Sequence, residues 1–442
     1  MNQVKVKPVI YNMKKMPLLL MICLLFLPLC AYADDSSDGN SSDVDSSDGD
    51  SSDGNLSDGD SDSSGGPVDI KDRIFELGFL NINLGLSSDL LGFTGGRLSL
   101  GDFFKETIVL DIDNFSNGLK VNLGVGIVPV YFNINLGSWG IGVSTKFEAM
   151  GNLNLSGKLL TFSRAINDKP DASGALFASL GINTFFNIKK FKITVKPSLF
   201  YTIAYFKPDI SYTFDPDSGN ILKIEYDAQV YTAFPVEDAA SVLNDLSLLP
   251  TPGVDLSFGV EYALSKNFDV GLEFINIPII PSVLKNYMQF SGSIGGDEPI
   301  DLLGDGMESL FSSFNNISGD PSYGTGRQET RRPFRLSTWV NWRALGTAFL
   351  TLTPMIGFSV NPLYVKEFTM EFGMNARLNW SNMFVTTAGI NYIDRIWRNS
   401  IDFAFNLRLF EFNIGLDMRS HDFIQSWTGG GFGINMGFMF GW

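Results

Sequence analysis

The sequence has very few of the residues from which catalytic and metal centres are built. It contains two cysteines, Cys23 and Cys30, and a single histidine, His421, in 442 residues. Both cysteines lie in an N-terminal segment that we expect to be removed, so the mature chain would have no disulfide and no thiolate metal site. His421 stands between Ser420 and Asp422, but neighbours in sequence rarely form a catalytic triad, whose members meet through the fold. We therefore expect no enzyme, no metal and no cofactor.

Positive charge and long apolar runs are scarce as well. The chain has 32 Lys and Arg residues against 48 Asp and Glu, for a net charge of −16. A nucleic-acid partner requires a basic stripe, and none is visible, so this class of partner is excluded. The longest apolar run, residues 17–29, is shorter than the roughly 20 residues that a transmembrane helix needs.

The N-terminus has the three parts of a secretory signal peptide. Lys14 and Lys15 precede the apolar run, and Ala31-Tyr32-Ala33 supplies a cleavage site with small residues at its first and third positions. The pattern predicts a signal peptide over residues 1–33 that is cleaved after Ala33. The alternatives are a lipid anchor on Cys30, although Leu29 is not the small residue expected before it, and an uncleaved helix. Met13 would be a more usual first residue than Met1.

A five-residue repeat based on Ser-Ser-Asp-Gly fills residues 34–66, with eleven aspartates between positions 34 and 62. Val44 and Leu56 are the apolar residues of its five repeats, so the segment cannot bury enough surface to offset the entropy of ordering it. We expect a disordered, acidic spacer. Weak calcium binding is the alternative, although the spacing of the carboxylates does not match a calcium loop.

From residue 74 onward, apolar and polar residues alternate with a period of two, which is typical of strands. Residues 368–380 show the pattern best, because every second residue is apolar, as in Phe368, Met370 and Phe372. Other segments behave alike: 191–205, 222–232, 254–264, 268–274, 401–409 and 412–418. Together with weaker cases they indicate about fourteen strands in residues 67–442.

These strands indicate a membrane barrel more than a soluble sandwich. Their apolar faces are rich in Phe, Trp and Met, and their polar faces favour Asn, Gly, Thr and Ser over Lys and Glu. Many are also long enough to cross a bilayer, and a closed barrel is the only sheet that satisfies every backbone group in lipid. We predict an all-β fold, a transmembrane antiparallel β-barrel of about 14 strands in the cell outer membrane, with short helical plug or lid segments.

The C-terminus matches the assembly signal of outer-membrane proteins, polar-x-Gly-x-x-aromatic-x-aromatic. Apolar residues alternate up to the last residue, and the signal positions are Asn435, Gly437, Phe440 and Trp442. An apolar, unpaired edge has to be recognised and closed before it aggregates. The expected partners are therefore the barrel-assembly machinery and outer-membrane lipid.

Two stretches have helical spacing instead. In residues 235–249 an apolar stripe of Val236, Ala240, Leu243 and Leu246 is followed by the helix-stopping Pro250. Residues 305–314 begin with a capping box. Amphipathic helices in a barrel sequence serve as lids or plugs, or they pack outside on one barrel end. The stripe is therefore a candidate gate.

The charged residues of the barrel have two interpretations. Arginines 327, 331, 332 and 335 form the one basic cluster, so Arg327, Arg331, Arg332 and Arg335 are candidate contacts for a carboxylate or phosphate headgroup. Alternatively, they face anionic lipid from a loop or pair with acids in the lumen, which the sequence favours. Glu371, Arg377, Asp402, Arg408 and Glu411 are expected to form an interior charge network.

With an export signal, about fourteen strands and helical interruptions, the chain resembles the long-chain fatty-acid transporter (FadL-like) family. The likeness covers most of residues 67–442 but is one of architecture, because the family's Asn-Pro-Ala hatch motif is absent. The resemblance implies a hatch, for which residues 67–117 are the candidate, and passage of hydrophobic compounds. The expected function is a channel or transporter for hydrophobic small molecules. The alternative is a non-transporting structural, adhesin or secretion-associated surface barrel.

Overall fold

The computed structural model describes residues 9–12, 73–88, 107–110, 119–156, 166–215, 221–234, 250–295, 322–344, 349–364, 367–381, 383–407, 409–428 and 430–441. Strands dominate this part of the chain, and its single helix is α5 (Gln425–Thr428). No helix within these residues is long and apolar enough to cross a membrane. The acidic repeat and the segments 235–249 and 305–314, predicted as helices, lie outside the described residues, as does most of the predicted signal peptide.

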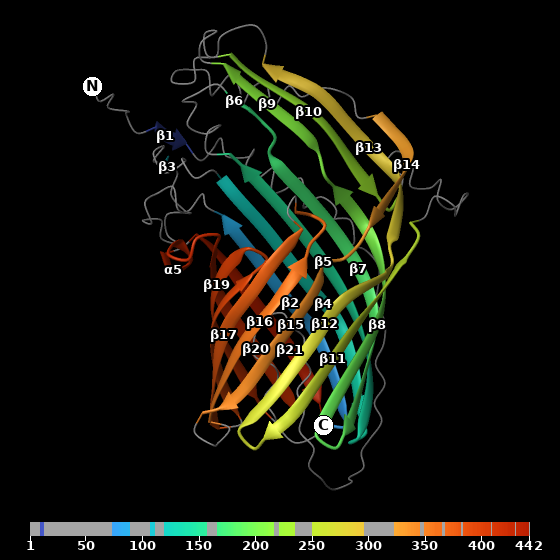
Figure 1. Ribbon diagram of the computed structural model, residues 1–442, viewed down its shortest axis with the longest axis vertical. Coiled ribbons are helices and arrows are strands. Elements are labelled where there is room, and N and C mark those ends of the chain that lie inside the picture. The colour runs from blue at the N-terminus through green and yellow to red at the C-terminus, as the bar shows by residue number, and fades with distance from the viewer. Residues whose placement is uncertain are drawn as a thin grey trace, which may run out of the picture.

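Fourteen of the described strands form a closed antiparallel ring (Figure 1). In ring order they are β2 (Phe75–Ser88), β4 (Leu119–Asn135), β5 (Trp139–Leu155), β7 (Asp171–Ile188), β8 (Phe191–Phe206), β11 (Gly253–Ser265), β12 (Phe268–Ile280), β15 (Phe334–Arg343), β16 (Leu350–Val360), β17 (Phe368–Ser381), β18 (Phe384–Ile393), β19 (Ile396–Asn406), β20 (Phe410–Ser420) and β21 (Gly431–Gly441). Each pairs with the next, and β21 pairs with β2 to close the ring. The predicted barrel of about 14 strands is confirmed.

A second group of strands continues the wall beyond the ring on one side (Figure 1). Its order is β6 (Ile166–Asp168), β9 (Asp209–Asp215), β10 (Ile221–Thr232), β13 (Ser282–Gly295) and β14 (Ser322–Thr330). It joins the ring where β10 pairs with β8. Away from the barrel, β1 (Val9–Asn12) pairs with β3 (Thr107–Leu110).

The outer face of the ring is apolar, as expected for contact with lipid. On β17, Phe368, Met370, Phe372, Met374 and Trp380 are between 43 % and 57 % exposed, whereas Glu371 between them is fully buried. The ring strands have from 10 to 18 residues, and roughly 9–11 suffice to cross a bilayer at the usual tilt. The alternation predicted from the sequence therefore separates a lipid-facing surface from a polar interior, and the barrel is of the transmembrane type.

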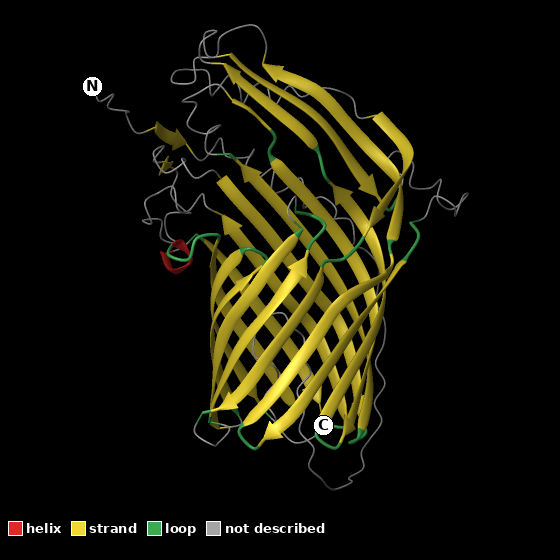
Figure 2. Ribbon diagram, in the orientation of Figure 1, coloured by secondary structure: helices red, strands yellow, loops and turns green. Residues whose placement is uncertain are grey.

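The two ends of the barrel differ in the length of their connections (Figure 2). At one end the turns are short: residues 189–190 link β7 to β8, and residues 266–267 link β11 to β12. At the other end, long segments such as 207–252 separate successive ring strands. Outer-membrane barrels have short periplasmic turns and long extracellular loops, so the short-turn end corresponds to the periplasmic side. The end of β21 and the beginning of β2 lie at this side.

Part of the segment expected as a hatch belongs to the wall. Residues 75–88, within the candidate hatch 67–117, form β2, which pairs with β21 on one edge and β4 on the other. The residues between β2 and β3, and those between β3 and β4, lie outside the described part of the chain. A hatch made of those residues stays a prediction.

Polar interior side chains lie against the wall because glycines face them from neighbouring strands. A Cβ atom on Gly373 would stand 2.0 Å from Oδ1 of Asn391, and one on Gly389 would stand 2.2 Å from Oδ1 of Asn375. No Cβ tolerates such distances, so only glycine lets these amides lie flat. The interior of this half of the barrel is therefore polar and closely packed, with Asn391 only 1 % exposed.

Candidate functional site in the barrel lumen

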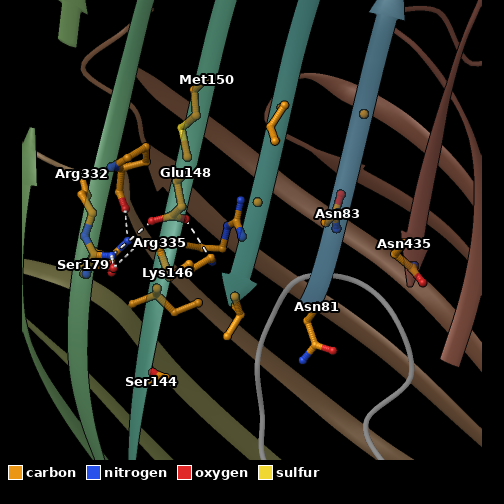
Figure 3. Close-up of a pocket in the computed structure, with 18 of the residues that line it drawn as sticks. Asn81, Asn83, Ser144, Lys146, Glu148, Met150, Ser179, Arg332, Arg335 and Asn435 are labelled. Atoms are coloured by element: carbon orange, nitrogen blue, oxygen red, sulfur yellow. Dashed lines mark hydrogen bonds and ion pairs between the residues drawn. The ribbon is translucent and has the colours of Figure 1, made fainter. Parts of the chain in front are cut away.

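The lumen holds a cavity of about 430 Å³ that runs along β2, β4 and β5. Its polar lining is rich in amides, and Figure 3 shows Asn81 and Asn83 on β2 and Asn435 on β21. Val128, Met150 and Leu363 add apolar contacts to the lining, whereas Ile82, Val125 and Met436 lie on the lipid-facing side of their strands and border the cavity with their backbone. Ligand sites commonly combine an apolar lining with a few placed polar groups, so a small molecule with both kinds of surface fits this lining.

Arg332 is the most heavily bonded side chain of the site. It comes from the connection between β14 and β15, and its Nε and Nη2 donate hydrogen bonds of 2.7 Å to the two carboxylate oxygens of Asp255 on β11. Its Nη1 donates to Oε2 of Glu148 at 3.2 Å and to Oγ of Ser179 at 3.1 Å (Figure 3). Lys146 Nζ lies 3.0 Å from the other oxygen of Glu148. One arginine thus ties together β5, β7 and β11 from inside.

Other interior charges are paired separately. Arg335 lies 2.8 Å from Oε2 of Glu371 and donates to Asp394 at 3.0 Å. Near the periplasmic end, Arg73 lies 3.4 Å from Glu411 and donates to Asn406 at 3.0 Å.

The residues of the predicted charge network are thus spread over several contacts. Glu371 and Glu411 are buried and ion-paired, as described, and Asp402 is buried and accepts a hydrogen bond of 2.7 Å from Asn435. Arg377 lies close enough to Glu411 to act on it electrostatically, and Arg408 is not among the described residues. These carboxylates face the lumen, but they do not form one continuous network with each other.

The four arginines of the predicted basic cluster are not brought together. Arg327 is on β14 and pairs with Glu329, and both side chains are largely exposed. Arg331 is exposed as well. Arg332 and Arg335 enter the lumen, each with its own acids, which corresponds to the lumen-pairing alternative. The sequence analysis missed Asp255 and Glu148. The pair Lys146 and Glu148, two charged residues in an otherwise apolar strand, could have indicated that Glu148 faces the lumen.

The connection between β16 and β17 crosses the lumen. Leu363 in this connection is 3 % exposed and packs against Ala175 and Phe177 on β7 and Phe200 on β8. Burial, and then the nearby carboxylate of Asp394, raise the pKa of its neighbour Tyr364, so that phenol stays neutral. The segment narrows the lumen, and its Leu363 and Tyr364 border the cavity together with residues of β7 and β8 such as Ser179 and Ser198.

The barrel wall has a register break beside the cavity. Along β4 and β5, Ile127 pairs with Phe147 and the next pair is Tyr131 with Ser144, so three residues of β4 stand opposite two of β5. The middle one of the three, Pro129, has no N–H to donate to the ladder. On the other side of β4, Leu80 of β2 has a φ of 52°, at a second register shift between β2 and β21. Two of the ring's register breaks thus lie close together on the neighbouring strands β2 and β4, and others lie between β7 and β8, β11 and β12, and β17 and β18.

The cavity reaches this break. Val128 and Lys146 line the cavity, and so does Val143, which is 42 % exposed. Val143 lies on the same face of β5 as the lipid-facing Trp139, Ile141 and Phe147, because every second residue of a strand points to the same side. Its side chain therefore belongs to the outer surface. Val143 therefore borders the cavity through its backbone, and the wall at the break is one sheet thick between the lumen and the lipid.

The remaining predicted residues have the following places. His421 lies after β20, with Nε2 2.7 Å from Nδ2 of Asn122, while Asp422 accepts hydrogen bonds from the backbone N–H groups of residues 424 and 425. Asn435, Gly437 and Phe440 lie on β21, with Phe440 46 % exposed on the lipid side. Trp442 and the candidate gate residues 236, 240, 243 and 246 are not among the described residues. Within the described ranges, no three His, Cys, Asp or Glu side chains gather as metal ligands would.

Comparison with known proteins gave structural neighbours only. No family model and no curated protein sequence matches the chain. Among solved structures, the toluene transporter TbuX of Ralstonia pickettii has 9% sequence identity and a TM-score of 0.42, over 83% of this chain and 89% of that one. The toluene transporter TodX of Pseudomonas putida has 9% sequence identity and a TM-score of 0.45, over 83% of this chain and 89% of that one. A Pseudomonas aeruginosa FadL homologue has 9% sequence identity and a TM-score of 0.40, also over 83% of this chain and 89% of that one. These outer-membrane transporters are similar in barrel architecture, which is the level at which the sequence resembles their family.

Proposed function

We propose that this protein is an outer-membrane channel that transfers small hydrophobic molecules between the barrel lumen and the membrane. The observation that carries the proposal is the register break at Pro129, where the wall between β4 and β5 borders the lumen cavity at Val128. An unbroken ladder of backbone hydrogen bonds leaves no passage between strands. A break at a proline removes ladder bonds locally, which weakens the wall between β4 and β5 at this point.

The physical advantage of a lateral route lies in solvation. A hydrophobic molecule that left the lumen into water would lose about 25 cal/mol for every Å² of apolar surface re-exposed. Leaving sideways into the acyl chains avoids that loss. The amides along β2 and β21 then serve to orient the polar end of a solute, if it has one, while the apolar side chains at the break contact the rest.

Deletion of Pro129 together with Leu80 tests the route, because it leaves two residues of β4 opposite two of β5, keeps β4 in register with β2, and also removes the extra residue of β2 opposite β21. Entry of radiolabelled toluene and oleic acid into cells that carry the protein should fall several-fold. Pro354→Val is the matched control, since Pro354 also lies in a ring strand, β16, but its strand keeps a constant register with both neighbours. Uptake of arabinose reports on polar leakage. Equal toluene and oleate entry with and without Pro129 and Leu80, in protein that migrates as a folded barrel, would reject the lateral route.

A second function, a non-transporting surface barrel in structure, adhesion or secretion, is favoured by a different observation. Buried ion pairs such as Arg332 with Asp255 and Arg335 with Glu371 occupy much of the lumen near the long-loop end. Groups of this kind can fill a lumen for stability alone. Failure of both solutes to enter faster than in cells without the protein would favour this second function.

A further inference from the structure

The contact that holds the lumen-crossing segment, residues 361–364, to the far wall consists of one side chain in an apolar socket. Leu363 fits between Ala175, Phe177 and Phe200, and Met150 and Tyr205 pack at the margin of this cluster. We call these five residues the Leu363 socket. In ring order, β11, β12 and β15 stand between β8 and β16, so this leucine reaches from one side of the barrel to another.

The described polar attachment of the segment to the same wall is a single hydrogen bond. Ser173 Oγ on β7 donates to the carbonyl oxygen of Leu363 at 2.5 Å. Two further hydrogen bonds lie within the segment: Leu363 N donates to Oδ1 of Asn361 and Tyr364 N to the carbonyl of Asn361, both at 3.1 Å. On the side away from the socket, Asn361 N donates to the carbonyl of Glu367 at 2.9 Å, and the guanidinium carbon of Arg395 lies 5.1 Å from the ring centroid of Tyr364. The segment is therefore a small preformed loop. When Leu363 leaves the socket, the loop can move away from β7 and β8 as a unit.

We propose that the Leu363 socket is a binding site for short branched aliphatic groups, and that such a ligand displaces Leu363 and moves the 361–364 segment out of the lumen. The proposal deepens the proposed function and rests on it, because it assigns a ligand class to a channel for hydrophobic molecules. The structural basis is that the socket already holds an isobutyl group, that of Leu363. A ligand with the same group competes for the same contacts, and Leu363 then acts as the internal occupant of an otherwise vacant site.

The socket is also connected to the ion-paired centre of the lumen. Phe200, one wall of the socket, has the guanidinium carbon of Arg332 5.3 Å from its ring centroid. Phe200 and Phe177 meet edge to face with centroids 6.2 Å apart, so their positions are mutually fixed. Displacement of Leu363 therefore changes the packing around the side chain that ties β5, β7 and β11 together.

The first experiment records single-channel conductance in planar bilayers with 4-methylpentan-1-ol as the probe, since its chain ends in an isobutyl group. The alcohol should raise the open fraction of the wild-type channel in a saturable way. Leu363→Ala should be more open without alcohol, and its half-maximal alcohol concentration should be lower by roughly tenfold to a hundredfold, as expected when a buried leucine no longer competes. Leu180→Ala is the matched control, because Leu180 lies on β7 but faces lipid with 45 % exposure. Heat-modifiable migration confirms that each variant is folded.

The second experiment ties the segment down. Oxidation of a Ser173→Cys/Leu363→Cys pair should form a disulfide, hold the channel in its low-conductance state and remove the response to the alcohol, and reduction should restore conductance. Absence of the disulfide, or an unchanged response after oxidation, would overturn the proposal, as would a Leu363→Ala channel indistinguishable from wild type. Toluene and oleate entry is scored separately. If the channel responds to the alcohol but does not pass toluene or oleate, the proposed socket stands and the proposed transport of hydrophobic molecules is rejected.

Discussion

At the scale of single residues, the lumen depends on charges that have lost most of their contact with water. The Arg332 and Asp255 side chains are 6% and 2% exposed, and they form a bidentate pair that Glu148 extends. Removing one member of a buried pair leaves an uncompensated charge, which costs more than the pair itself contributes. Both carboxylate oxygens of Asp255 accept hydrogen bonds of 2.7 Å from Arg332, so the charge of Asp255 is compensated by this arginine.

Replacement of Arg332 should therefore destabilise the barrel strongly. We expect Arg332→Met to lower the free energy of unfolding in urea by about 3 kcal/mol, and Arg332→Met/Asp255→Asn to lower it by less than the sum of the single changes. Arg327→Met serves as the control, because its exposed pair with Glu329 should contribute less than about 1 kcal/mol. Equal losses for Arg327→Met and Arg332→Met would show that the lumen pair is no more stabilising than a surface pair.

Sequence reasoning could select these arginines but not their partners. Arg332 and Arg335 stand out as part of a basic cluster, and pairing with acids in the lumen was one of the expected outcomes. The partners are remote in sequence, since Asp255 and Glu148 are 77 and 184 residues away from Arg332. The sequence of one strand does not determine which strand lies across the lumen from it. The order of the strands in the ring must therefore be known before such partners can be predicted.

At the scale of elements, period-two alternation predicted the wall strands closely. The segment expected over residues 368–380 is β17 (Phe368–Ser381), and that expected over 254–264 is β11 (Gly253–Ser265). The same pattern could not tell ring strands from those of the extension, because β10 and β13 alternate in the same way outside the ring. The 361–364 segment has no periodic pattern at all, so its passage across the lumen could not be foreseen.

The terminal strand leads to a prediction on assembly. Phe440 pairs with Phe410 on one side and Leu77 on the other, and so stands where the ring closes. Phe440→Asp, or removal of Trp442, should leave unfolded protein in the periplasm, because the edge is no longer recognised and closed. Phe405→Asp is the matched control, since Phe405 is also lipid-facing, with 42 % exposure against 46 % for Phe440. Heat-modifiable migration in outer-membrane fractions measures the yield, and equal yields for the two aspartate variants would refute a signal at the C-terminus.

The helical stripe in residues 235–249 leads to a prediction on binding. If Leu243 faces the cargo, Leu243→Asp should weaken saturable binding of long-chain fatty acids to the purified protein in detergent, because a carboxylate replaces apolar contact area. Leu248→Asp, on a different face of the same predicted helix, should change binding less. A gate role for the stripe fails if both variants bind fatty acid like the wild type.

At the scale of the whole molecule, the barrel has a defined direction. The ring closes between β2 and β21 at the short-turn end, and the extension of β6, β9, β10, β13 and β14 projects from the other end (Figure 1). The predicted signal peptide over residues 1–33 fits a barrel of this type, because insertion into an outer membrane follows export. The acidic repeat then follows directly after the predicted cleavage site.

The predicted signal peptide leads to a prediction on processing. N-terminal sequencing of protein isolated from membranes should give Asp-Asp-Ser-Ser, starting at Asp34, because signal peptidase cuts after small residues such as Ala31 and Ala33. Labelling with radioactive palmitate provides the control for the lipid-anchor alternative. A blocked N-terminus with incorporated label would place the anchor on Cys30 and reject cleavage after Ala33.

The flat amides of the interior have an evolutionary consequence. Asn391 can lie against the wall only while residue 373 is glycine, and Asn375 only while residue 389 is glycine. A larger residue at either glycine would push the amide across the lumen, and a smaller side chain in place of the amide would free the glycine to change. Descendants of this gene should therefore exchange both members of such a pair together, and the pairs should appear as correlated columns once homologous sequences are compared.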